Sequence, residues 1–176
     1  AVIFPDLTID KPSGKLNLQG AICAGNTLNL NKGNLNATAN GSLITVKNSA
    51  TVNGGSDSSL VEGAMAKQGN TDFLFPLGSS SRGFHPLRIT APQNDSDIFI
   101  ATYYPNQQTF GNSLDTGLSN LSACEYWNLK RKVGTSNVAV SLSWNAQSCD
   151  ITTPSDMRLA GWNGSTWKNL GGASPT

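Results

Sequence analysis

The feature that most constrains the fold is a recurrence of short apolar segments in residues 1–66. They include LTI at 7–9, LNL at 16–18, LNL at 28–30 and LITV at 43–46, with Asn, Gly or Ser between them. Leu7, Leu28 and Ala50 mark a spacing of about 21 residues. This period predicts a parallel β-solenoid with three short faces per coil, because each repeat stacks on its neighbour.

Glycine and asparagine occupy the expected corners of these coils. Gly14, Gly25, Gly33 and Gly41 lie where a corner needs a positive φ. Asparagine tolerates the same region, and we expect it to stack on asparagine of the next coil. The alternative for residues 1–66 is a β-sandwich of short strands. We favour the solenoid because the apolar segments are too short for sandwich strands.

Longer strands are expected from residue 67 onward. In TDFLFPL, Phe73 and Phe75 lie on one face and Leu74 on the other. Alternation of the same kind runs through NVAVSLSW at 137–144, and turn-rich segments separate the strands. We therefore predict an all-β chain, with a short β-solenoid over 1–66 followed by an antiparallel β-sandwich over 67–176. The best helical candidate, LVEGAMAKQ at 60–68, is weakened by Gly63.

Composition argues against several classes of partner. Charged residues are only 13% of the chain and the net charge is +1, so nothing favours binding to nucleic acid or an anionic membrane. No apolar run approaches the ~20 residues that span a bilayer, and we expect no membrane insertion. Polarity carried by Asn, Ser, Thr and Gly is typical of secreted β-proteins, which predicts an extracellular location. Ala1 already lies in an expected strand, so we expect a mature product or an excised piece.

The cysteines allow one internal disulfide at most. Cys23, Cys124 and Cys149 form no C-x-x-C pair, which disfavours a zinc site. Cys124 and Cys149 flank an expected hairpin and are the candidate pair. Three buried thiols are the alternative.

The single histidine does not predict catalysis. His85 follows the loop GSSSRG in the segment TDFLFPLGSSSRGFHPLRI, which we interpret as a hairpin that fixes the β-domain. No Gly-x-Ser-x-Gly turn is present and no second histidine could complete a metal pair. Glu125 and Asp115 could serve as a glycosidase acid–base pair, but nothing in the sequence places them within reach. We expect no catalytic residues and no enzymatic activity.

Two further sets of residues are candidate ligand sites. Trp162 and Trp167 stand on opposite sides of an NGS turn, where they could share a face and form an exposed platform for sugar rings. Asp95 and Asp97 could hold a structural calcium ion with loop carbonyls, although a solvated turn explains them as well. We expect no other cofactor.

Four stretches of the chain carry a resemblance to a known family. DLTIDKPSGKLNLQGAICAGNTLNLNKGNL resembles ladder segments of large, repeat-rich, adhesin-like surface proteins of Bacteroidetes exported by the type IX secretion system, including gliding-motility-type proteins. The stretches GGSDSSLVEGAMAKQGNTDFLFPLGSSSRGFHPLRI, EYWNLKRKVGTSNVAVSLSW and LAGWNGSTWKNLGG are similar to the segments that follow there. Phe84 and His85 depart from the Tyr-Arg-like pair that is frequent in that family.

The resemblance implies a location and a structural role. It suggests a non-catalytic module of a cell-surface adhesin, appendage or filament, involved in cell adhesion. Its partners would be neighbouring modules or identical subunits of a surface assembly. A carbohydrate-binding module using Trp162 and Trp167 is the alternative.

Overall fold

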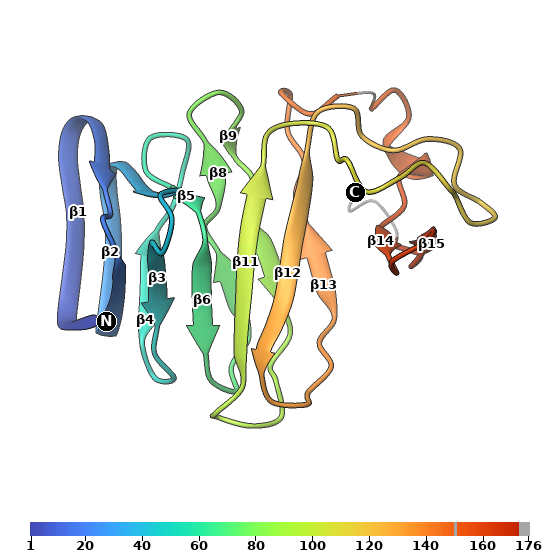
Figure 1. The fold of residues 1–176 in the computed structure, drawn as a ribbon. Helices are drawn as coiled ribbons and strands as arrows, with labels where there is room; N and C mark the ends of the chain where they lie inside the picture. Colours follow the sequence, from blue (N-terminus) through green and yellow to red (C-terminus); the bar gives the residue numbers. More distant parts are fainter. Residues whose placement is uncertain (150, 173–176) are drawn as a thin grey trace.

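The computed structural model describes residues 1–149 and 151–172, and these residues form almost only β-structure. A single 3-10 turn, Pro154–Asp156, is the helical element within those ranges. Figure 1 shows coils at the N-terminal end, long antiparallel strands beyond them, and a small hairpin at the opposite end. The predicted class, a parallel β-solenoid followed by antiparallel sheets, is confirmed.

The solenoid consists of stacked coils. β1 (Val2–Asn17) and β2 (Ala21–Ala37) each run around one coil, whereas the next coil is divided into β3 (Leu43–Val46), β4 (Thr51–Gly54) and β5 (Val61–Gly63). β1 pairs in parallel with β2, and β2 pairs in parallel with β3, β4 and β5 in turn. Each short apolar segment of the sequence therefore forms one face of a coil.

The repeat length changes along the solenoid. Leu7 pairs with Leu28, which agrees with the predicted 21-residue spacing. Leu28, however, pairs with Val52 and not with Ala50. The prediction for Ala50 was wrong because the third coil is longer than the second.

Corner glycines behave largely as predicted. Gly14, Gly33 and Gly41 have φ between +77° and +79°, while Gly25 is not among the positive-φ glycines. A Cβ on Gly33 would lie 2.6 Å from the carbonyl oxygen of Lys11 in the coil below. Gly33 is therefore required both by its φ and by the close stacking of the coils.

One strand links the solenoid to the antiparallel region. β6 (Met65–Gln68) pairs in parallel with β3 and antiparallel with β11 (Ile98–Tyr104). β12 (Tyr126–Val133) then completes a continuous sheet in the order β1-β2-β3-β6-β11-β12 (Figure 1). The predicted domain boundary after residue 66 falls inside β6, and the helical candidate at 60–68 is extended, with β5 and β6 separated at Ala64.

A second sheet covers the antiparallel part of this long sheet. Its strands lie in the order β13-β10-β7, with bounds β7 (Phe73–Phe75), β10 (Leu87–Ile89) and β13 (Val140–Leu142). Phe73 and Phe75 are buried while Leu74 is 47% exposed, as their alternation predicts. Two short hairpins complete the fold: β8 (Gly78–Ser79) with β9 (Gly83–Phe84), and β14 (Ala160–Trp162) with β15 (Trp167–Asn169).

The hydrophobic core runs through both regions without a break. Leu28 and Ile44 of the solenoid belong to the same buried cluster as Phe75, Ile89 and Phe99. Each of these side chains contributes about 1.5–3 kcal/mol through its burial. The solenoid and the sandwich therefore share one core.

Candidate functional site

His85 lies in a closed aromatic and acidic cluster. Its imidazole is fully buried and stacks on Tyr103, with ring centroids 4.7 Å apart and an interplanar angle of 3°. Nε2 lies 3.0 Å from the Arg82 carbonyl oxygen. Nδ1 lies 3.2 Å from Oε2 of Glu125 but makes no aligned hydrogen bond. Trp127 encloses the ring further and donates its indole N–H to the His85 carbonyl at 3.1 Å.

The groups around His85 are arranged for stability. The Tyr103 hydroxyl donates to Oε2 of Glu125 at 2.8 Å, and Glu125 is only 6% exposed. Burial, together with the hydrogen bond and charge of Glu125, raises the pKa of Tyr103 well above its usual value. A substrate cannot reach the imidazole in this geometry, so the cluster fixes the loop after β7 and does not form an open catalytic site.

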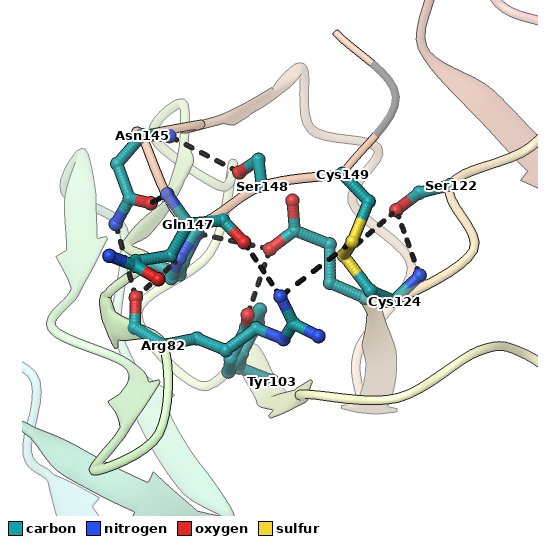
Figure 2. The surroundings of a disulfide bond; sticks show 10 residues. Arg82, Tyr103, Ser122, Cys124, Asn145, Gln147, Ser148 and Cys149 are labelled. Atoms are coloured by element: carbon teal, nitrogen blue, oxygen red, sulfur yellow. Dashed lines mark hydrogen bonds and ion pairs between the residues drawn. A yellow bond between two sulfur atoms is a disulfide. The ribbon is translucent and has the colours of Figure 1, made fainter.

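A disulfide bond lies near this cluster, at the residue that precedes Glu125 (Figure 2). Cys124 and Cys149 are bonded, with their Cα atoms 5.9 Å apart, so this predicted pair is formed. The expected hairpin between them is wrong, because β12 pairs with β11 and β13 pairs with β10. The bond joins the segment just before β12 of the long sheet to the segment that follows β13 of the second sheet. Cys23 is free and buried.

Arg82 ties the loop between β8 and β9 to the turn before Cys149. Its guanidinium donates to the Gln147 carbonyl at 2.7 Å and lies 3.7 Å from the Cys149 sulfur (Figure 2). The side-chain amide of Asn145 donates a hydrogen bond to the Arg82 carbonyl oxygen at 3.2 Å. The GSSSRG loop is therefore held by residues that lie 63 to 67 positions further along the chain.

Glu125 and Asp115 are not brought together as an acid–base pair. Glu125 faces Tyr103 and His85 inside the molecule. Asp115 accepts a hydrogen bond from the backbone N–H of Thr116 and lies 3.6 Å from the Lys168 ammonium. Each carboxylate therefore has a separate structural partner.

Asp95 and Asp97 have different environments. Asp97 is fully buried and accepts a hydrogen bond from the Ser136 hydroxyl, while its Oδ1 atom has no hydrogen-bond partner. Asp95 is exposed. Within residues 1–149 and 151–172, no cluster of three His, Cys, Asp or Glu side chains could hold a metal ion. The calcium site stays a prediction without further support from the geometry.

Trp162 and Trp167 share a face but do not form an open platform. They are paired across the β14–β15 hairpin, with ring centroids 5.5 Å apart. Trp167 is only 8% exposed and donates its indole N–H to the Gly111 carbonyl at 2.9 Å. The expectation that both indoles are exposed was therefore wrong for Trp167. Phe110, in the connection after β11, packs on both rings and is itself 48% exposed.

Two buried charged groups of the solenoid region were not recognised from the sequence. Glu62 accepts hydrogen bonds from Lys15 Nζ at 2.6 Å, Asn34 Nδ2 at 2.9 Å and Ser80 Oγ at 2.6 Å. Burial alone would raise the pKa of Glu62, but these bonds outweigh it and the pKa lies below its usual value. Lys67, 2% exposed, is the other such group. The sequence signal that could have revealed them is that Glu62 and Lys67 are the only charged residues of the apolar segment LVEGAMAKQ.

The three hydrogen-bond partners of Glu62 line one side of a shallow groove. Its volume is about 400 Å³, and its lining includes Lys15, Lys32, Asn34, Asp57 and Ser80 at the corners of successive coils. The charges in it largely offset each other, and Lys15 is already paired with Glu62. The groove therefore presents no strongly charged binding surface.

The N-terminal face of the solenoid exposes several apolar side chains. β1 is an edge of the long sheet, because it pairs with β2 alone. Val2 and Ile3 are about 60% exposed, and Phe4 and Leu16 are 38% and 41% exposed. An apolar sheet edge of this kind is a docking surface or an aggregation hazard.

Comparisons with known proteins do not identify a relative. Protein-family models, curated proteins and solved structures give no match to this chain. The described residues contain no helix with the length and hydrophobicity to cross a bilayer.

Proposed function

We propose that this chain is a non-catalytic structural module of a large secreted adhesin or appendage of the cell surface. The observation that carries the proposal is the uncovered first coil, with apolar side chains about 60% exposed on β1. Solenoid coils bury their apolar faces only against neighbouring coils or caps. A module with one open coil suits a stalk or filament, in which each unit continues the next.

The rest of the molecule supports a role in extension and presentation. One core spans the solenoid and the sandwich, and β6 belongs to both, so the two regions make one stiff body. The Cys124–Cys149 disulfide suits an oxidising, extracellular environment. The single histidine of the chain, His85, is enclosed in the interior.

The proposal is tested on the native protein from its source. An antibody raised against this chain would locate it on intact cells, and the captured protein would be weighed by mass spectrometry and imaged by electron microscopy. We expect surface labelling, with the module in a longer polypeptide or an ordered fibre. A discrete intracellular monomer of 18.5 kDa would contradict the proposal.

A carbohydrate-binding role is the second candidate function. The observation that favours it is the pair formed by Phe110 and Trp162, whose rings are 6.3 Å apart and inclined by 23°. Beside Phe110 lies a small cavity of about 180 Å³ lined by amide side chains that include Gln107, Asn112 and Asn120. Aromatic faces and amides together suit the C–H faces and hydroxyls of a sugar.

This second candidate is tested by glycan-array binding of two variants. We expect Phe110→Ala and Trp162→Ala each to weaken binding to any bound glycan at least about tenfold, a loss of 1.4 kcal/mol. Leu170→Ala is the matched control, because Leu170 is an exposed apolar residue of the same terminal region without a ring. Wild-type binding by both aromatic variants, or no glycan bound by the parent chain, would end this candidate.

A further inference from the structure

Several apolar side chains of the first coil are exposed, although the residues that pair with them in the second coil are buried. Leu16 pairs with Leu35, yet Leu16 is 41% exposed and Leu35 is fully buried. Ile3 pairs with Cys23, and their exposures are 60% and 7%. The third coil covers Leu35 and Cys23, whereas none of the described strands pairs with the other side of β1 to cover Leu16 and Ile3. The open face of β1 thus has the same apolar pattern as an interface that exists one coil further on.

Polar ladders on the outside of the coils also end at β1. The Asn53 amide donates to Asn29 at 2.8 Å, and the Asn29 amide donates to Thr8 at 3.1 Å. In a second ladder the Asn36 amide donates to Asn17 at 2.8 Å. Every amide in both ladders donates toward the N-terminal coil. Among the described residues, the Thr8 hydroxyl and the Asn17 amide end these ladders, and neither donates to a further coil.

We infer that β1 binds a further parallel coil of the same repeat type, supplied by a neighbouring module; this inference rests on the proposed function. The added coil continues the register at about 20 residues per turn, the spacing of Val2 and Ile22. It places apolar side chains over Ile3 and Leu16, and hydrogen-bond acceptors opposite Thr8 and Asn17.

Two other occupants fit this surface less well. If a second copy of the chain paired its β1 with this β1, the hydrogen-bond donors at the ends of the two sets of ladders would face each other. The opposite edge of the sheet, β12, is a single strand carrying Lys130, Arg131 and Lys132, which are largely exposed. It could cover only one of the faces of the first coil, and its like charges protect it against pairing.

The sequence supplies a direct test of the inferred coil. Gly20 precedes Ala21 and Ile22, and the chain begins with the similar pair Ala1 and Val2. A second copy of residues 1–20 placed before Ala1 therefore reproduces a natural connection between coils. We expect the extended protein to stay monomeric by light scattering and to melt at least about 3 °C higher. Amide hydrogens in the original β1 should exchange about tenfold more slowly.

Matched extensions separate coil formation from mere lengthening. A Gly/Ser extension of equal length, and a duplicated coil with its Leu7 and Ile9 counterparts changed to Asn, should give neither effect. An intact duplication that also gives neither effect would overturn the inference. An unmodified chain that forms a dimer with protected β1 amides would overturn it too, because the occupant would then be a second copy. If native protein nevertheless proves to be a long surface fibre, the proposed function stands and only the parallel coil fails.

Discussion

Lys67 places a positive charge inside the molecule. Its ammonium donates to the carbonyl oxygens of Lys47 and Asn48 at 2.8 Å each and of Ala50 at 3.2 Å. These carbonyls belong to the turn between β3 and β4, so the lysine of β6 closes the turn of the preceding coil. None of the ion pairs among the described residues includes Lys67. Burial lowers its pKa to about 8 from the ordinary 10.5.

This lowered pKa predicts a stability that increases with pH. Above pH 8 the folded state releases the Lys67 proton, while the unfolded chain holds it up to about pH 10.5, so the unfolded state binds more protons. Between pH 7.5 and 9.5 the free energy of unfolding of the parent should rise relative to Lys67→Met, by about 1–2 kcal/mol after solvent screening. Urea unfolding of both proteins measures this difference. A constant difference would mean that the carbonyls keep the ammonium charged.

The buried hydroxyl of Tyr103 gives a second prediction at this scale. Tyr103→Phe removes the donor to Glu125 and leaves a buried carboxylate oxygen without that bond. We expect a loss of about 1–3 kcal/mol in the free energy of unfolding, measured by urea titration. Tyr104→Phe is the control, since Tyr104 stacks on Tyr126 and is half-buried. Equal effects of the two changes would show that the Glu125 bond is not what matters.

At the scale of elements, the disulfide joins the two sheets of the sandwich. Cys124 precedes β12 and Cys149 follows β13, and the bond spans 25 residues of sequence. Changing both cysteines to Ser should lower the free energy of unfolding by about 2–4 kcal/mol. A reducing agent should destabilise the parent by a similar amount and leave the double variant unchanged. If reduction destabilises both equally, its effect does not come from this bond.

Elements whose signal is local could be predicted from the sequence. The short apolar segments predicted the faces of the solenoid, and the alternation around Phe73 and Val140 predicted strands of the sandwich. Pairings set by distant residues could not be predicted in the same way. The partner of Leu28 depended on the length of the third coil, and the burial of Trp167 depended on Phe110, which lies 57 residues away. Glu62 likewise collects its partners from three separate segments.

On the scale of the whole molecule, the shared core decides how the chain unfolds. β6 is hydrogen-bonded to the solenoid on one side and to β11 on the other, and Met65 within it is fully buried. A solenoid alone unfolds by nearest-neighbour steps, coil by coil. Here β6 pairs with the last coil and also belongs to the sandwich. Unfolding of the solenoid would therefore expose the core of the sandwich. We therefore expect one cooperative unit.

This expectation is tested by a substitution in the solenoid that is read out in the sandwich. All four Trp residues lie at or beyond position 127, so their fluorescence reports the antiparallel region and the terminal hairpin and not the solenoid. Ile44→Ala in β3, at a fully buried position, should lower the free energy of unfolding by about 2–4 kcal/mol. Fluorescence and far-ultraviolet circular dichroism should then shift to the same lower urea midpoint. Ile3→Ala, at a 60% exposed position, should shift neither by more than about 0.5 kcal/mol. A fluorescence midpoint that stays in place while hydrogen exchange accelerates in the coils would show that the solenoid unfolds independently of the sandwich.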